Sequence, residues 1–326
     1  MRSSHRHALT LVEILVGIAI LGILATMLMP AVQSSRESAR RNACQNNLRQ
    51  VGLAVLAHEQ SLGRFPSNGW GWRWVGDADR GNGVEQPGGW IYNTLPYLEQ
   101  QDVHDLGKGL SGDAKLAATV KMVGTRMPVF ICPTRRGPEP LPFKAHTINF
   151  TAYPSAAKTD YAVNRGDLYI FGGYGPADDQ DLGYRWPSLQ RLTGISYTRS
   201  LVPARNITDG LSKTYLLGEK HLNARLYLTG NDSGDDASIY HGEDFDNARH
   251  TGNSGDVDGD DIPPVSDAAP VESVFEAMSF GGPHQALNMA FCDGSVHPIS
   301  FEIDPVIHRR LGNREDGHSI ENQDYQ

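Results

Sequence analysis

Cysteine is scarce in this sequence, which has only Cys44, Cys132 and Cys292 among its 326 residues. In an oxidising compartment that number allows one disulfide and leaves one thiol. The sequence contains no zinc-binding motif and no Gly-rich phosphate loop. The spacing of its Ser, Cys, His and Asp residues signals no nucleophile–base pair. We therefore expect no catalytic residues and no enzyme activity.

The sequence also lacks a basic patch, and its acidic residues are concentrated in one segment. The formal net charge is −9. Residues 231–267 hold eleven acidic residues and one basic residue, a local charge of −10, so the rest of the chain carries +1. Nucleic-acid binding needs clustered Lys and Arg, which the sequence lacks. We expect no nucleic-acid partner.

Charge is nearly absent from residues 8–30, where Glu13 is the one acidic or basic side chain. A helix of about 20 apolar residues spans the hydrocarbon core of a bilayer, so residues 9–29 predict a membrane helix. A short basic leader with Arg2 and Arg6 precedes it, as in a targeting segment. An ionisable residue in a membrane segment is costly and is a candidate functional residue. The alternative is an ordinary signal anchor with a stray Glu near the interface.

An apolar stripe continues the helix beyond the membrane segment. Its members recur at intervals of three and four residues over 44–62, which is one face of a helix. Gly63 supplies a C-cap, and Pro66 prevents continuation. We predict one helix over residues 9–62, with a kink at Pro30.

The remainder of the chain predicts short strands and a short helix. Apolar runs predict strands at residues 129–132, 159–163 and 214–217. Residues 95–106 predict a helix. Asp293-Gly294 is a strong hairpin turn signal, and it lies between two apolar runs at 287–292 and 296–301.

Four of the five tryptophans lie within 21 residues, and they are Trp70, Trp72, Trp74 and Trp90. Clustered aromatics can stack on sugar rings, which makes these residues candidates for ligand binding. The alternative is that they pack a Gly-rich loop onto the long helix, because Trp is usually a core residue.

The acidic segment allows two interpretations. Asp256, Asp258 and Asp260 alternate with other residues among glycines, and hard oxygen ligands at such positions suit calcium. The complete EF-hand pattern is not met. The alternative, which the composition favours, is a solvated and mobile acidic loop. Apart from calcium we expect no cofactor.

His284, His297 and Asp293 lie near the predicted hairpin. A catalytic or metal site would combine such residues with Glu219. The simpler interpretation, which we favour, is that Asp293 is a turn residue and that His284 satisfies a loop.

Residues 8–13, ALTLVE, resemble a prepilin signal: a small residue, an apolar residue, Thr, an apolar pair and Glu before a long apolar helix. The resemblance implies cleavage between Ala8 and Leu9 by a prepilin peptidase on the cytoplasmic side, and N-methylation of Leu9. Prepilins usually have Gly where Ala8 stands and often Phe where Leu9 stands. The resemblance also implies that Glu13 pairs with the N-terminal amine of a neighbouring subunit, and such a pair fixes register.

Further segments occur in the same order as in a large bacterial family that has prepilin-like N-termini and a domain of unknown function. They include LPYLEQQ, VFICP, TDYAVNRGD, ITDGLSKTYLLGEK and HQALNMAFCDGS. The family ends in a motif of His, nine residues and Asp-Gly, which here is His284 to Asp293-Gly294. The resemblance covers residues 8–300.

The resemblance implies an α+β, pilin-like fold, in which a long N-terminal membrane-anchoring helix packs on an antiparallel β-sheet domain. It also implies a disulfide between Cys44 and Cys132, because the family carries cysteines at both positions. Cys292 falls where the family usually has a small apolar residue, so we interpret it as the free thiol.

We therefore expect a structural pilin-like or pseudopilin-like subunit that assembles through its N-terminal helix into a pilus-type or type II secretion-type filament. Its expected partners are prepilin peptidase, other pilin-like subunits and the inner membrane, which the chain crosses once. The alternative is an anchored binding module that holds a glycan or other ligand with its Trp-rich loops. The predicted segments are a leader at 1–8, a transmembrane and assembly segment at 9–30, an amphipathic helical segment at 31–63 and a periplasmic or surface domain at 64–326 with its acidic loop at 231–267.

Overall fold

The computed structural model describes residues 11–143, 147–150, 154–178, 181, 183–253, 261–269 and 277–325. The chain divides into two compact units, Met1–Asn42 and Ala43–Gln326. Ala8, Leu9, Asp256, Asp258 and Asp260 lie outside the described residues. The cleavage site and the acidic triplet proposed for calcium therefore stay predictions.

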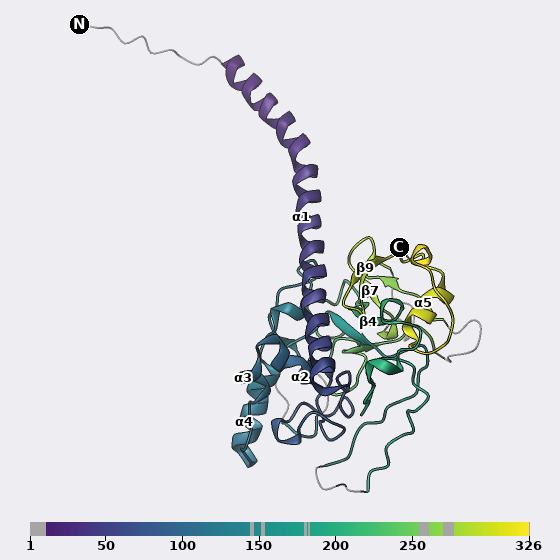
Figure 1. The fold of residues 1–326 in the computed structure, drawn as a ribbon. Coiled ribbons are helices and arrows are strands. Elements are labelled where there is room, and N and C mark those ends of the chain that lie inside the picture. Colours follow the sequence, from purple (N-terminus) through teal and green to yellow (C-terminus); the bar gives the residue numbers. More distant parts are fainter. Residues whose placement is uncertain are drawn as a thin grey trace. The chain divides into compact units, whose positions relative to one another are not determined.

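The first unit is helical throughout its described part. The helix α1 runs from Leu11 to Leu62 and continues through Pro30, and Figure 1 draws its N-terminal part in purple. Its apolar side chains are exposed as far as Val32, with Leu11 at 74% and Leu21 at 66% exposure. Among the described residues, α1 is the one helix that is long and apolar enough to cross a membrane. One membrane-spanning helix therefore agrees with the predicted single-pass anchor.

The C-terminal part of α1 belongs to the second unit and has one buried face. Cys44, Leu48, Val51 and Val55 are each fully buried, which confirms the predicted stripe. Gly63 ends the helix with a φ of 70°, a conformation that glycine adopts without a steric penalty.

The second unit is built on a five-stranded sheet with the order β5-β3-β4-β8-β9. All neighbouring pairs are antiparallel except β3 and β5, which are parallel. The α+β class is therefore confirmed, as are the predicted hairpin and two of the three predicted strands. The strand bounds are β3 Tyr161–Asn164, β4 Tyr215–Glu219, β5 Ala248–Arg249, β8 Leu287–Phe291 and β9 Val296–Ile299.

The two faces of the sheet are covered differently. On one face, Leu48, Val51 and Val55 of α1 belong to one hydrophobic cluster. The strand residues of that cluster include Val163, Leu217 and Ala290. On the other face, Leu287 and Met289 pack in a second cluster that includes residues of the C-terminal helix α5, Pro305–Gly312. Side chains of a strand alternate between faces, so β8 contributes to both clusters.

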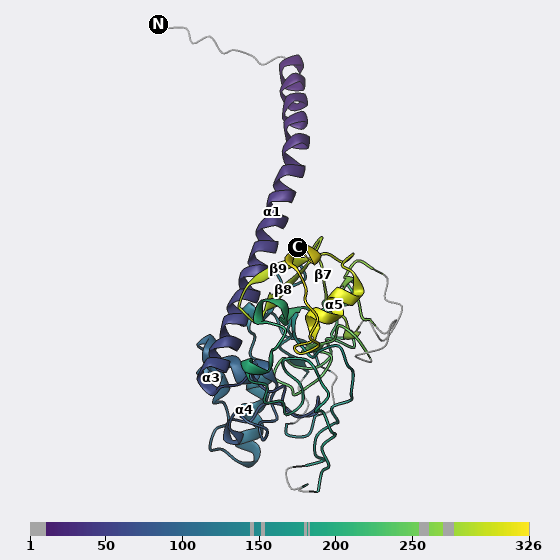
Figure 2. The ribbon, with the colours of Figure 1, turned by 45° about the vertical axis from the view of Figure 1, so that its right-hand side comes forward.

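Short helices and two small sheets complete the unit (Figure 2). The helices are α2 Trp90–Thr94, α3 Gln101–His104 and α4 Gly112–Val123, and the small sheets pair β1 Leu141–Pro142 with β2 Ser155–Ala156 and β6 Val265–Ser266 with β7 Gly281–Gly282. Two local predictions were wrong. The run at 129–132 is not a strand, because Pro128 begins a 3-10 helix that reaches Phe130. The helix predicted at 95–106 is interrupted at Glu99, whose φ is 59°.

Candidate functional site

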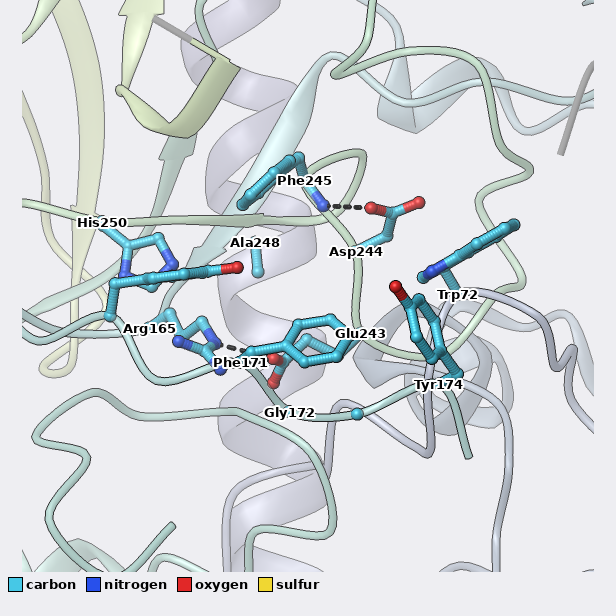
Figure 3. A pocket seen from close by; sticks show the side chains of 12 residues that line it. Trp72, Arg165, Phe171, Gly172, Tyr174, Glu243, Asp244, Phe245, Ala248 and His250 are labelled. Carbon is cyan, nitrogen blue, oxygen red and sulfur yellow. Dashed lines mark hydrogen bonds and ion pairs between the residues drawn. The ribbon is translucent and has the colours of Figure 1, made fainter. Parts of the chain in front are cut away.

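A pocket of about 280 Å³ lies beside the parallel pair β3–β5. Three loops form it with β5: the Trp-rich loop, the segment after β3 and the segment before β5. Figure 3 places Trp72 and Tyr174 at one end of the pocket and His250 at the other. The lining residues are Trp72, Arg165, Tyr169, Phe171, Gly172, Gly173, Tyr174, Glu243, Asp244, Phe245, Ala248 and His250.

The walls of the pocket are largely aromatic. Phe171 and Tyr174 remain 46% and 47% exposed, and their rings lie 4.9 Å apart in an edge-to-face arrangement. Trp72 meets Tyr174 edge-to-face at 6.0 Å. The guanidinium of Arg73 lies 4.7 Å from the Tyr174 ring centroid and 5.0 Å from that of Trp72. These contacts hold exposed rings in place, as a preformed ligand site requires.

A buried ion pair supplies polar groups between these walls. Arg165 Nη2 lies 2.6 Å from Glu243 Oε1, and the backbone N–H of Thr198 donates to the other carboxylate oxygen. Arg165 Nη1 is buried and has no hydrogen-bond partner within the described residues. A Cβ at Gly172 would lie 2.7 Å from Glu243 Oε1, so only glycine lets the backbone approach this closely. The pocket thus contains one buried donor that a ligand acceptor could satisfy.

His250 provides a second unused polar atom. Burial, together with Arg165 and Arg249, holds the pKa of His250 well below its ordinary value, so the ring is neutral at pH 7. Its Nδ1 is buried and lacks a hydrogen-bond partner in the described chain. A neutral imidazole nitrogen and a guanidinium N–H, between aromatic rings, can bind a flat ligand rich in hydroxyl or carboxylate groups.

The four clustered tryptophans have different environments. Trp70, Trp74 and Trp90 are buried, with 4%, 1% and 0% exposure. Trp90 Nε1 donates to the Asn247 carbonyl at 2.8 Å. Trp72 is partly exposed and lines the pocket. Three of the four rings are therefore core residues, and Trp72 is the one that lines this pocket.

The described part of the acidic segment is not a solvated loop, which corrects that prediction. Asp235 and Asp267 are 1% and 3% exposed. Asp235 contacts Arg136 and lies 3.0 Å from Lys220 Nζ, and Asp267 lies 2.8 Å from Arg135 Nε. Burial would raise the pKa of Asp235, but Arg136 and Lys220 outweigh it and hold that pKa well below its ordinary value. Bases from elsewhere in the sequence neutralise these acids, so composition within the segment could not reveal their burial.

Three other acids of the segment crowd together beside the pocket. Carboxylate oxygens of Asp236, Asp244 and Asp246 lie within 4.8 Å of one another. Burial and then Asp236 raise the pKa of Asp244 to about 7, and Asp246 Oδ2 is buried with no hydrogen-bond partner in the described part of the chain. Oxygen donors of this kind suit a hard cation such as calcium, so these described residues could hold one.

The expected disulfide is confirmed: Cys44 and Cys132 are bonded, and both are fully buried. Cys292 is the free thiol and is also buried. His284 lies against the disulfide, with its Nε2 3.5 Å from Cys132 Sγ and 3.6 Å from Glu219 Oε1.

The two ends of the His-x9-Asp-Gly motif have separate roles. Asp293 is an exposed turn residue whose Oδ1 accepts from the backbone N–H of Ser295 at 2.9 Å, and Gly294 completes the turn with a φ of 87°. His284 instead belongs to the buried cluster around the disulfide. The predicted turn role of Asp293 therefore holds.

Sequence reasoning missed Arg165, Glu243 and His250. Arg165 lies in the segment TDYAVNRGD, which the family resemblance had singled out, but no local pattern connects it with Glu243, which is 78 positions away. The parallel pairing of β3 with β5 brings these residues together.

Comparison with known families settles the class of the chain. Residues 33–306 match a family described as a protein of unknown function (DUF1559), and residues 3–29 match the prokaryotic N-terminal methylation motif. The chain belongs to this DUF1559 family. Its N-terminus carries the prepilin-type motif, which is that of a pilin-like chain processed by prepilin peptidase. No curated protein and no solved structure matched.

Proposed function

We propose that this protein is a pilin-like subunit that assembles into a filament through its N-terminal helix and displays residues 43–326 on the outer side of the inner membrane. The bare apolar surface of α1 carries this proposal. None of the most apolar 18-residue stretch of this helix is buried within the described chain. A surface of that kind is stable in lipid or against the same surface of other subunits.

Glu13 gives the assembly its register. It is the one acidic residue of α1 before Glu37, and it lies in the first turn of the described helix. A carboxylate in an apolar environment is costly until it meets a positive charge. The free N-terminal amine of a processed neighbouring subunit would supply that charge. A helix one register out of place moves Glu13 away from this amine.

Charge reversal tests this proposal in cells that express the full chain with prepilin peptidase. Glu13→Lys should leave the protein in the membrane but abolish cross-linked multimers and material released by shearing. Glu37→Lys is the matched control, because it reverses a charge on the same helix outside the apolar segment. Normal assembly of Glu13→Lys, or equal loss in both variants, would contradict the proposal.

The pocket supports a second function, the binding of a polar ligand with a flat apolar face, such as a sugar. The buried Arg165 Nη1 without a partner, between aromatic walls, favours this reading. Trp72→Ala should weaken binding to an array of neutral and acidic oligosaccharides. Trp186→Ala is the control, because Trp186 is partly exposed and lies outside the lining of this pocket. Unchanged binding in Trp72→Ala, or no binding by the wild type, would refute this function.

A further inference from the structure

Four metal-ligating residues meet in the core of the second unit. Sγ of Cys44 and Cys132, a carboxylate oxygen of Glu219 and a ring nitrogen of His284 lie within 4.8 Å of one another. The residues are 0%, 0%, 0% and 6% exposed in the same order. They come from α1, the segment after Phe130, β4 and the segment between β7 and β8, so only the folded chain assembles them.

The spacing of the donor atoms agrees with a tetrahedral site. His284 Nε2 lies 3.5 Å from Cys132 Sγ and 3.6 Å from Glu219 Oε1. In tetrahedral zinc sites the bonds are about 2.3 Å to sulfur and about 2.0–2.1 Å to nitrogen and oxygen, so neighbouring ligand atoms are about 3.3–3.8 Å apart. His284 Nε2 therefore already lies at ligand separations from both the Glu219 oxygen and the Cys132 sulfur.

Glu219 gives an independent indication that the cluster has a further partner. Its side chain is fully buried, and Oε2 accepts hydrogen bonds from the backbone and the side-chain amide of Asn288 at 2.9 and 3.0 Å. Oε1 has no hydrogen-bond partner within the described residues, and its charged neighbour is His284 Nε2 at 3.6 Å, which belongs to the same ligand set. A buried carboxylate oxygen is costly unless it is paired or binds a metal. Asn288 fixes the carboxylate, as partners of metal ligands commonly do.

We propose that reduction of the Cys44–Cys132 disulfide converts this cluster into a structural zinc site with Cys44, Cys132, Glu219 and His284 as its four ligands. A dithiol reductant cleaves the S–S bond by thiol–disulfide exchange, and it leaves as its own cyclic disulfide. Zinc then binds the two sulfurs as thiolates and releases their two protons. The sulfurs separate from about 2.05 Å to about 3.8 Å.

The closed, buried ligand set makes this a structural site. All four positions are filled by side chains, which leaves no open position for water or substrate. Thiolate and imidazole ligands select zinc over the hard cations magnesium and calcium. Zinc would link Cys44 to Cys132 across the same 88-residue separation as the disulfide. The cross-link between α1 and the rest of the domain thus persists whether the chain is oxidised or reduced.

Zinc loading of the full chain in detergent micelles tests the proposal. The protein is reduced with a phosphine, exposed to zinc, freed of excess metal and analysed for bound zinc. We expect one zinc per reduced chain and none per oxidised chain. Cobalt should give an intense visible spectrum with a thiolate charge-transfer band. If the reduced wild type bound no zinc, the proposal would be overturned. A cobalt spectrum typical of octahedral coordination would overturn it as well.

Variants separate the site from adventitious binding. Cys292→Ser is the matched control, because it removes a buried cysteine outside the cluster and should still bind one zinc. Glu219→Gln keeps the shape of the side chain, and it should weaken zinc binding and shift the cobalt spectrum. Near-ultraviolet circular dichroism establishes that each variant is folded. Zinc binding by the folded Cys44→Ser/Cys132→Ser variant equal to that of the wild type would refute the proposal, and so would unchanged affinity in Glu219→Gln.

Discussion

Removing the disulfide should destabilise the second unit chiefly through its unfolded state. The Cys44–Cys132 bond closes a loop with a sequence separation of 88 residues, which contains α2, α3 and α4. For a loop of that length the chain-entropy relation predicts a loss of about 4–5 kcal/mol at 25 °C. The double variant Cys44→Ala/Cys132→Ala should therefore lose a large share of the stability of a typical domain, which is about 5–15 kcal/mol.

Urea unfolding of the full chain in micelles, with a metal chelator present, measures this loss. Fluorescence of the buried Trp74 and Trp90 reports the transition. The denaturant slope should also rise in the double variant, because an unfolded chain without the cross-link exposes more surface. Cys292→Ala is the control, since it removes a buried sulfur without opening a loop, and it should cost about 1 kcal/mol.

The comparison between the two variants tests whether the disulfide stabilises the protein by constraining the unfolded chain. If the double variant lost no more than Cys292→Ala, with an unchanged slope, the disulfide would not constrain the unfolded chain as the relation assumes. A large loss with an unchanged slope would also contradict the reasoning, because it would place the effect in the native state.

Three further predictions concern the pocket and its surroundings. Burial raises the pKa of Asp244 to about 7, so the folded state binds more protons than the unfolded state between about pH 4 and 7, and stability falls as pH rises through that range. Asp244→Asn removes this pH dependence of stability. The variant should unfold at a higher temperature than the wild type at pH 8, but not at pH 4. If the melting temperatures of the two proteins changed equally with pH, the raised pKa of Asp244 would be contradicted. Trp90→Ala should cost about 3–5 kcal/mol in urea unfolding because the ring is fully buried, whereas Trp72→Ala at the pocket rim should cost much less; equal losses would be inconsistent with these environments. Arg165→Met leaves the Glu243 carboxylate unpaired and should cost about 3–5 kcal/mol, and adding Glu243→Gln should recover much of it, whereas strictly additive losses would exclude the pairing.

The sequence pattern correctly predicted the elements whose structure depends on residues that are close together in the chain. The apolar stripe of α1 and the Asp293-Gly294 hairpin each depend on residues close together in the chain, and both are present. The run at 129–132 was misread because a short buried apolar segment looks the same in a strand and in a 3-10 turn. Its backbone joins no sheet within the described residues.

The sequence did not predict the features that depend on contacts between residues far apart in the chain. Asp235 and Asp267 seemed to belong to a solvated loop, since their partners Arg136 and Arg135 lie about a hundred positions earlier. The pocket depends on the parallel pairing of β3 with the two-residue strand β5, which has no sequence signature of its own. The Cys44–Cys132 pairing came from family resemblance, since three cysteines alone leave the pairing open.

The central claim is that this chain is processed as a prepilin and assembles through its N-terminal helix. Mass spectrometry of the N-terminus of the protein recovered from its native membrane tests it most directly. The account predicts a mature chain that begins at N-methylated Leu9. An intact Met1, or a chain cleaved beyond Met29, would contradict it and would leave a plain anchor or a secreted protein.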